Sequence, residues 1–207
     1  MGVARRSTDY ATTLDEMAMP RVIVQEFVSI DGFASGPKGS VDFIPASTRG
    51  DRGFGREQTK LMDSIGVMLL GRVTYAMFAG YWPRISDNDG QPFADTFNAL
   101  PKIVFSSTLQ HAPWRRWPEA TIVRTNPAQE VARLKEPGGK DLFVSGSLSI
   151  AQSLISAQLV DEYRLVACPI VLGNTRPVTR GVRRSPRSTP RRSSWSPRVH
   201  LTRRVFT

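Results

Sequence analysis

Small and hydroxyl-bearing residues follow three apolar segments, at places where a strand is expected to end and a helix to begin. Backbone N–H groups and the helix dipole favour phosphate binding at such places. Gly71 lets a ligand approach the backbone, Arg72 supplies a planar cation and Thr74 supplies a hydroxyl. The three turns are Leu70-Gly71-Arg72-Val73-Thr74, Phe105-Ser106-Ser107-Thr108 and Val144-Ser145-Gly146-Ser147-Leu148.

A glycine or serine after a strand is more often a turn or a helix cap than a phosphate contact. In an open parallel sheet, however, the carboxyl ends of the strands line one crevice where ligands bind. Three such turns at one edge indicate a ligand with several phosphates. The turn at Gly146 lacks the GxGxxG spacing, which disfavours an ordinary Rossmann dinucleotide site.

The elements that must position these turns alternate along the chain. Apolar, β-branched segments predict strands, and helical spacing of apolar residues predicts the helices between them. This alternation indicates an α/β fold with a mainly parallel central sheet and helices on both faces. The predicted strands are 21–28, 67–70, 102–105, 120–124, 141–144 and 162–172, and the helices are 54–65, 72–80, 92–99, 127–135 and 147–157. A long loop is predicted over 32–53.

Composition excludes several classes of protein and of site. No segment of the 207 residues approaches the roughly 20 apolar residues of a membrane span. Cys168 is the single cysteine and His111 and His200 are the two histidines, which argues against a disulfide, a zinc cluster or a histidine-rich metal site. A reducing, cytoplasmic location is therefore expected. Residues 1–18 are interpreted as a disordered leader without a secretory signal.

The net charge of +10 is concentrated in one segment. Ten of the 28 basic residues are arginines between 176 and 207, where no Lys, Asp or Glu occurs, and the remaining 18 equal the 18 acidic residues. Residues 1–175 taken together are therefore neutral. Residues 176–207 are rich in Arg, Ser and Pro without a lasting period, which predicts disorder. The alternative function is nucleic-acid binding through this basic tail.

Five segments in order resemble the C-terminal reductase domain of the bacterial bifunctional riboflavin-synthesis deaminase–reductase. That domain is similar in fold to dihydrofolate reductase. The segments are VQEFVSIDGFA, LLGRVTY, LPKIVFSST, LFVSGSL and LVDEYRLVACPIVLG, and they span about residues 20–175. The zinc signature of the deaminase half is missing from the sequence, so the chain resembles a stand-alone member. A homodimer is compatible with this resemblance.

The resemblance implies NADPH as cofactor and hydride transfer to a small heterocycle of the pyrimidine or pteridine kind. The positions Gly71, Arg72 and Thr74 match the family's phosphate-binding turn. Ser106 and Ser107 match its site for the adenosine 2′-phosphate. The loop that holds the pyrophosphate is matched by Gly146, Ser147 and Leu148.

Asp31 is the candidate catalytic residue, because it matches the aspartate of the family's Ser-Leu-Asp-Gly motif, with Ile30 in place of leucine. The alternative is that Asp31 makes an Asx turn before Gly32. Asp42 and Phe43, in the long loop, are candidates for the substrate pocket.

Two further groups are given structural interpretations. Asp161 and Glu162, which open the last strand, are read as solvated acids, with a weaker functional reading for Glu162. The near-helical spacing of Tyr75, Phe78, Tyr81 and Trp82 favours core packing over a stacking platform.

The sequence departs from the family after Asn174. Charge balance, periodicity and family resemblance all change there, which motivates the hypothesis of a frameshift near codon 175. The final hairpin of the sheet is then expected to be missing, the edge of the preceding strand to be unpaired, and the chain to be an inactive, truncated family member in the least favourable case. Resequencing the locus tests this hypothesis.

Overall fold

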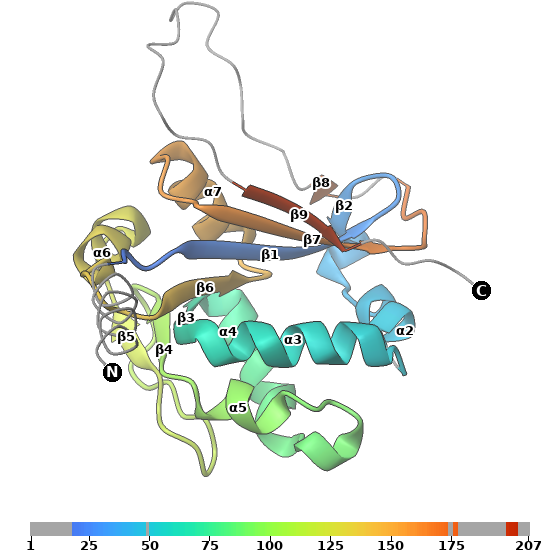
Figure 1. Cartoon of the computed structure of the whole chain (residues 1–207), viewed down its shortest axis with the longest axis horizontal. Helices are drawn as coiled ribbons and strands as arrows, with labels where there is room; N and C mark the ends of the chain where they lie inside the picture. Colours follow the sequence, from blue (N-terminus) through green and yellow to red (C-terminus); the bar gives the residue numbers. More distant parts are fainter. Residues whose placement is uncertain (1–17, 49, 174–175, 178–197, 203–207) are drawn as a thin grey trace, which may run out of the picture.

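A seven-stranded sheet forms the centre of the computed structural model, which describes residues 18–48, 50–173, 176–177 and 198–202 (Figure 1). Every pairing within this sheet is parallel, and the strand order is β5-β4-β3-β6-β1-β7-β9. Its strands are β1 (Val22–Ser29), β3 (Ile65–Gly71), β4 (Lys102–Phe105), β5 (Thr121–Val123), β6 (Asp141–Ser145), β7 (Glu162–Cys168) and β9 (Arg198–Thr202). The predicted parallel α/β architecture is confirmed.

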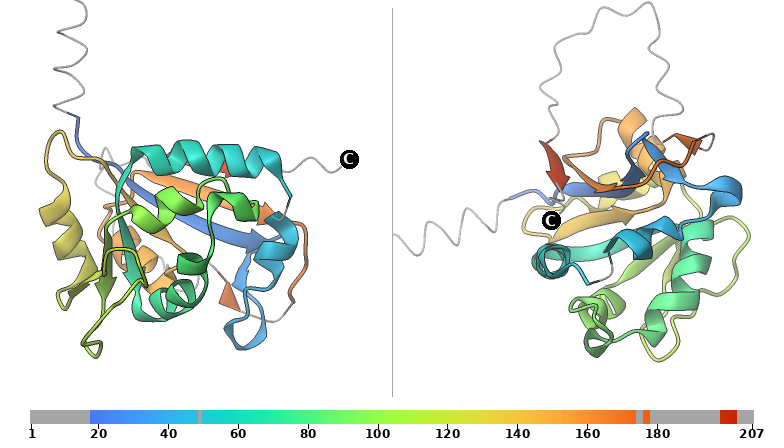
Figure 2. Two further views of the ribbon diagram at one scale, coloured as in Figure 1. Left: turned by 90° about the horizontal axis from the view of Figure 1, so that it is seen from below. Right: turned by 90° about the vertical axis from the view of Figure 1, so that its right-hand side faces the viewer.

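Helices cover both faces of this sheet (Figure 2). The α-helices are α2 (Phe43–Thr48), α3 (Arg52–Ser64), α4 (Arg72–Tyr81), α5 (Ala94–Ala99), α6 (Pro127–Leu134) and α7 (Leu148–Ser156). Three short 3-10 turns lie between these elements: η1 (Pro37–Gly39), η2 (Trp82–Arg84) and η3 (Asp87–Asp89). Residues of α3, α4 and α5 pack in one apolar cluster and residues of α6 and α7 in the other. None of the helices in the described ranges is long and apolar enough to cross a membrane.

Alternation along the central strands divides the core between these two clusters. In β1, Ile23 belongs to the cluster under α3, whereas Val22 and Val24 belong to the cluster under α7. In β6, Phe143 and Val144 divide in the same way. Because successive side chains of a strand point to opposite faces, a strand buried on both faces must be apolar at nearly every position. This requirement explains why these strands read as continuous apolar runs.

The stretch 32–53 differs from the predicted loop. It contains β2 (Phe33–Ser35), η1, α2 and the start of α3. The Asp51 side chain caps α3 by accepting a hydrogen bond from the backbone N–H of Phe54 at 2.9 Å. Glycine density predicted a loop here, but short elements and a capped helix tolerate the glycines. The next helix boundary differs too, because β3 begins at Ile65 directly after α3.

Two short strands lie within the tail that was expected to lack structure. Strand β8 (Arg176–Pro177) pairs with β2, and β9 pairs in parallel with β7. The expectation is therefore wrong for these residues, and the described edge of β7 is paired.

Strand β7 itself ends at Cys168, before Pro169, instead of at residue 172. Among the described residues the sheet ends in a single parallel strand and not in a hairpin. The rest of the predicted tail, and residues 1–17 of the predicted leader, lie outside the described residues.

Candidate functional site

The turns after β3 and β6 are joined by direct hydrogen bonds. The backbone N–H of Gly71 donates to the Ser147 hydroxyl at 2.9 Å, and the Thr74 hydroxyl donates to the Gly146 carbonyl at 3.3 Å. These contacts bring the starts of α4 and α7 together at the carboxyl edge of the sheet. The first N–H groups of each helix have no partner within the helix, so two sets of donors and two positive dipole ends converge.

The glycines of the two turns act in different ways. Gly146 has φ +70°, a left-handed backbone that other residues adopt at a cost. A Cβ on Gly71 would lie 3.6 Å from atoms of Ser147, Ser149 and Ile150. The two glycines therefore keep a space open between the helix starts. We call this space the cradle; its size and its N–H groups suit a phosphate group, and the residues predicted for that role border it.

The second predicted turn, Phe105–Thr108, lies next to this cradle, because Gly71 at the end of β3 is in register with Phe105 at the end of β4. The Ser106 hydroxyl accepts hydrogen bonds from the backbone N–H groups of Thr108 and Leu109, at 3.2 and 3.1 Å, so it stabilises the turn. Ser107 is exposed. All three turns thus lie on one edge, but the Ser106 hydroxyl is already engaged.

Arg124, which was not among the predicted residues, supports the Phe105–Thr108 turn. Its guanidinium donates to the carbonyls of Ser106, Ser107 and Leu109 at 3.4, 2.9 and 3.1 Å. The side chain is exposed and follows β5, the strand beside β4. A cation and an exposed hydroxyl therefore lie together about one strand away from the cradle.

A cavity of about 720 Å³ begins at the cradle and extends over the carboxyl edge of the sheet. Its lining includes all six residues predicted for the first and third turns: Gly71, Arg72, Thr74, Gly146, Ser147 and Leu148. Neither Ser106 nor Ser107 lines it. Another side is closed by β2, α2 and the segment between them, through Ala34, Ser35, Val41 and Ile44. The volume is in the range of a cofactor or small-molecule site.

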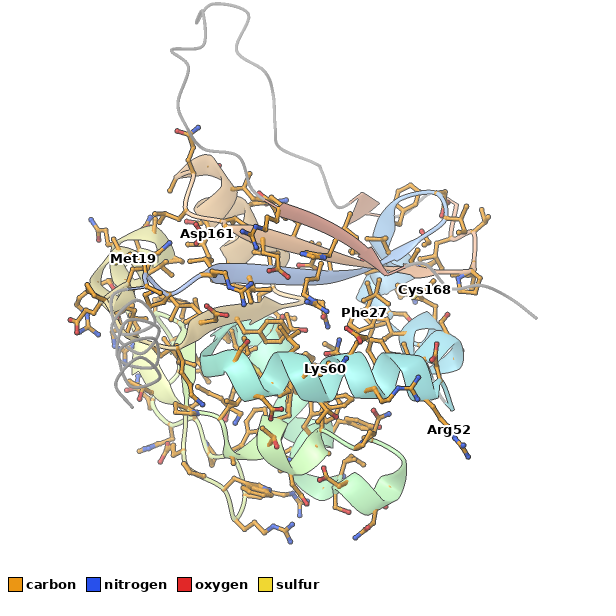
Figure 3. All side chains as sticks on the ribbon, viewed as in Figure 1. Met19, Phe27, Arg52, Lys60, Asp161 and Cys168 are labelled. Carbon is orange, nitrogen blue, oxygen red and sulfur yellow. The ribbon has the colours of Figure 1, made fainter. Side chains whose placement is uncertain are left out.

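Aromatic side chains form the wall of the cavity away from the cradle. Phe54 of α3, Phe78 of α4, Trp82 of η2 and Phe97 of α5 line it together with Phe27 and Phe93. The rings touch one another: Trp82 lies 4.4 Å from Phe97 and 5.6 Å from Phe93 between ring centroids. Figure 3 shows Phe27 between β1 and α3, where its ring is 5.8 Å from that of Phe54. The prediction of core packing is confirmed for Tyr75, which is buried, and for Phe78 and Trp82, which pack against the core and also line the cavity. It is wrong for Tyr81, which lines the cavity and is 48% exposed.

Two buried carboxamides lie in the same wall. Gln25 of β1 and Gln58 of α3 exchange hydrogen bonds at 3.2 and 2.9 Å. Each is at most 5% exposed, and both line the cavity. A carboxamide has two donor hydrogens and two acceptor lone pairs, so each keeps one donor and one acceptor position for a ligand. The pair can hold a ring that carries an amide edge.

Glu26, the next residue of β1, is a carboxyl that the sequence argument passed over. It is 4% exposed, it lines the cavity, and its Oε1 atom has no hydrogen-bond partner among the described residues. Burial raises the pKa of Glu26 from 4.5 to about 8. A neutral carboxylic acid, able to donate a proton, is therefore present in the cavity at pH 7.

Asp31 does not line the cavity. Its carboxylate accepts hydrogen bonds from the Ser29 hydroxyl at 2.6 Å and from the backbone N–H groups of Leu172 and Gly173 at 3.1 and 2.8 Å. These bonds lower the pKa of Asp31, the Ser29 hydroxyl contributing most. Asp31 thus fixes the segment after β7 to the turn after β1. The structure favours this anchoring role over proton donation.

Asp42 and Phe43 are also away from the cavity lining. Asp42 is exposed and accepts a hydrogen bond from the Ser40 hydroxyl at 2.7 Å, whereas Phe43 is 6% exposed and packs inside. Their neighbours Val41 and Ile44 line the cavity in their place. The predicted loop is therefore part of the site, but through other residues. No group of three or more His, Cys, Asp or Glu side chains within the described ranges is arranged to hold a metal ion.

Comparison with known proteins identifies relatives over most of the chain. The RibD C-terminal domain family matches residues 20–196. The uncharacterized protein YyaP of Bacillus subtilis (strain 168) is 31% identical over 159 residues, which is 76% of this chain and 79% of YyaP. YwjB, from the same strain and also uncharacterized, is 23% identical over 152 residues, 73% of this chain and 78% of its own.

Two solved structures share the fold. A putative riboflavin biosynthesis protein from Shewanella sp. PV-4 superposes with a TM-score of 0.59 at 22% identity, covering 76% of this chain and 82% of that one. The Thermotoga maritima diaminohydroxyphosphoribosylaminopyrimidine deaminase/5-amino-6-(5-phosphoribosylamino)uracil reductase superposes with a TM-score of 0.51 at 14% identity. That match covers 83% of this chain and half of the bifunctional protein. With a family match from residue 20 to residue 196, the chain belongs to the RibD C-terminal domain family.

Proposed function

We propose that this protein is an NADPH-dependent reductase that transfers a hydride to a small heterocyclic substrate. The observation that carries the proposal is the pair of hydrogen bonds that joins the starts of α4 and α7 at the mouth of one aromatic-walled cavity. One end of this cavity suits phosphate, and the other suits a flat ring. A dinucleotide that carries a reactive ring has both features.

The residues at the mouth fit such a cofactor. Gly71 and Gly146 keep the cradle free of side chains, and Arg72 contributes an exposed guanidinium beside it. The Thr74 hydroxyl and the N–H groups at the starts of α4 and α7 would hold the pyrophosphate with these residues. Leu148 lines the cavity immediately after the cradle.

NADPH is favoured over NADH by the Phe105–Thr108 turn. The exposed Ser107 hydroxyl and the Arg124 guanidinium provide a donor and a cation for a phosphate monoester, which a bare ribose does not require. Ser106 takes part through its position in the turn and not through its hydroxyl, which accepts two backbone N–H groups. Preference for the phosphorylated cofactor therefore rests mainly on Ser107 and Arg124.

The chain's own residues would position the reactants and exclude water. When bound, the reduced nicotinamide supplies the hydride, so the protein needs no nucleophile. Aromatic rings would hold the substrate flat, and the Gln25–Gln58 pair would orient it through hydrogen bonds. Such positioning lowers the barrier by removing the entropy of orientation from the reaction step.

The proposed function is tested by a screen in which the pyrimidines of riboflavin synthesis and dihydrofolate are offered as substrates. Oxidation of NADPH is measured as the loss of its nicotinamide absorbance. Calorimetric titration with NADPH alone tests the cofactor site without a substrate. Binding with preference over NADH supports the proposal. Equal or undetectable binding of both cofactors contradicts it.

Replacing Arg72 by alanine should weaken NADPH binding by roughly 10- to 100-fold. A charge-assisted hydrogen bond contributes about 1.5–3 kcal/mol, and Arg72 is the charged group at the cradle. Arg56→Ala, at an exposed position of α3 outside the cavity lining, is the matched control and should bind as the wild type does. An unchanged dissociation constant for Arg72→Ala, measured by calorimetry, would exclude the cradle as the phosphate site.

Replacing Arg124 by alanine should reduce the preference for NADPH over NADH by about tenfold. The substitution removes the cation beside Ser107 and three hydrogen bonds to the turn, but leaves the cradle intact. The measurement is the ratio of the dissociation constants of NADPH and NADH, determined for Arg124→Ala and for the wild type. A parallel loss for both cofactors would show that Arg124 maintains the turn without recognising the 2′-phosphate.

A further inference from the structure

Among the described residues that line the cavity, Glu26 is the one acid. It is at the centre of β1, in the run Val22–Ser29, and it is 4% exposed. Its Oε1 atom is buried without a hydrogen-bond partner in the described ranges. A buried polar group without a partner costs free energy, so a partner supplied by a ligand would stabilise it.

The sheet is open beside Glu26. Strand β6 ends at Ser145, which is in register with Gln25, so β1 continues past β6 from Glu26 onward. On its other side Glu26 is in register with Leu165 of β7. The chain of β6 turns away at Gly146, into the cradle. Glu26 therefore borders the space between the cradle and the aromatic wall, which the cavity occupies.

Within the part of the chain that the structure describes, no charged side chain pairs with Glu26. The lining residues of β2, α2, α3 and α7 are neutral, and the ionisable lining residues in the described structure besides Glu26 are Arg72 of α4 and Tyr81 at its end. Burial is accordingly the cause that raises the pKa of Glu26 to about 8. At pH 7 the carboxyl is protonated, and it can release this proton near neutral pH, as an efficient general acid must.

The aromatic wall adds a preference for a flat cation. Faces of Trp and Phe attract cations, more strongly when water is excluded. Trp82, Phe93 and Phe97 form such a wall on the same cavity that Glu26 lines. A ring that takes a proton from Glu26 becomes a cation, and it leaves a carboxylate as its counter-ion. Both products of the proton transfer are thus stabilised in one cavity.

We propose that Glu26 is the general acid of the site and that the substrate is a neutral, planar ring with a C=N bond, whose nitrogen takes the Glu26 proton. The inference rests on the proposed reductase function and extends it to the acid and the substrate class. An imine nitrogen is far more basic than a carbonyl oxygen. A carboxylic acid therefore protonates it readily before the hydride arrives, which favours C=N over C=O.

The step balances as follows. Glu26 gives its proton to nitrogen, which uses its lone pair to form the N–H bond, and Glu26 becomes a carboxylate. The imine carbon then receives a hydride from NADPH, forming a C–H bond, while the π pair of C=N becomes the new lone pair on nitrogen. The ring is reduced by two electrons, and NADPH is oxidised to NADP⁺. The Glu26 carboxylate recovers a proton from water.

A matched pair of probes separates proton donation from every other role of Glu26. Dihydroisoquinoline is a neutral ring imine that must gain a proton, whereas its N-methylated iminium cation needs none. Glu26→Gln should reduce kcat/KM for dihydroisoquinoline by about 100-fold or more, the usual contribution of a general acid. For the N-methylated cation it should stay within about threefold of the wild type. Glu57→Gln, at an exposed site on α3, is the control and should change neither.

A second readout requires no turnover. In protein labelled with ¹³C at glutamate carboxyls, one resonance should titrate with a midpoint near pH 8 and be missing in Glu26→Gln. A midpoint below about pH 6 would overturn the proposal. So would equal losses for the two probes, or wild-type protein that binds NADPH but reduces neither imine. Failure to bind NADPH would refute the reductase function itself, so the two failures are distinguishable.

Discussion

Replacing Glu162 by alanine should lower the free energy of unfolding by about 3–5 kcal/mol, although this residue lies at the edge of the sheet opposite the cavity. Glu162 is 2% exposed. Its carboxylate accepts hydrogen bonds from Arg21 at 2.9 Å and from Arg164 at 3.1 Å. Removing one member of a buried ion pair leaves the other charge uncompensated, which accounts for the size of the loss.

The uncompensated charge is mainly that of Arg164, because its side chain is only 16% exposed. The Arg21 side chain is 42% exposed, so it remains partly solvated, and it still donates a hydrogen bond to Asp141. The Arg21–Glu162 pair also joins β7 to the residue before β1, and so connects two neighbouring strands at the amino end of the sheet. Urea unfolding measures the effect as a lower midpoint with an unchanged slope.

Glu57→Ala is the matched control for this substitution. Glu57 also pairs with a cation, Lys60, at 3.4 Å, but both side chains are exposed. Exposed pairs contribute about 0–1 kcal/mol, so this variant should unfold near the wild-type midpoint. If Glu162→Ala lost less than about 1 kcal/mol, the Glu162 pair would behave as a surface pair. Adding Arg164→Leu to Glu162→Ala should restore part of the lost stability, because the uncompensated charge is then removed.

The interpretation of Glu162 as a solvated acid shows what the sequence could not settle. An acid at the start of a strand is usually solvated, and its partners Arg21 and Arg164 are identified only once β1 and β7 are known to be neighbours. The partners of Asp31 could not be identified from the sequence for the same reason. Its motif is visible in the sequence, but its bonds to Leu172 and Gly173 span more than 140 positions.

Local signals, by contrast, predicted much of the fold and one end of the site. The strand Lys102–Phe105 and the start of α4 at Arg72 agree with the prediction to the residue, because apolar runs and small-residue turns are encoded within a few positions. Gly71 and Gly146 were found by the same kind of signal. Arg198–Thr202 was missed because the composition of the whole tail concealed a five-residue polar–apolar alternation.

Glu26 and Gln25 carried a signal that was available but unused. They interrupt a strand that is otherwise apolar up to its last residue, Ser29, and that the alternation of elements placed in a parallel sheet. A strand covered on both faces has no solvated side for polar groups, so each polar residue in it requires a partner or a ligand. Gln25 has a partner in Gln58, 33 positions away, and Glu26 has none in the described structure. Polar residues within a central strand therefore indicate a site more reliably than acids in loops.

The stability of the protein should pass through a minimum near pH 7 to 8. The pKa of Glu26 is raised in the folded state from 4.5 to about 8, so between these values the unfolded chain loses a proton that the folded chain keeps, and stability falls as pH rises. Burial lowers the pKa of Lys102 from 10.5 to about 7. Between these values the unfolded chain holds the extra proton, and stability rises with pH.

Each limb of this profile is assigned by one variant. Glu26→Gln should abolish most of the fall between about pH 5 and pH 7.5, which amounts to several kcal/mol in the wild type, and Lys102→Met should abolish the rise toward about pH 10. The rise should be the shallower limb, because Lys102 Nζ donates to the carbonyls of Asn98 and Leu100 at 2.8 and 2.7 Å and lies 4.6 Å from the Trp114 ring centre, contacts that favour the ammonium form. The midpoints of urea unfolding at about pH 5, pH 7.5 and pH 10, measured for the wild type and both variants, test the two assignments. A fall that persists in Glu26→Gln would mean that another group titrates there and that Glu26 is ionised in the folded protein.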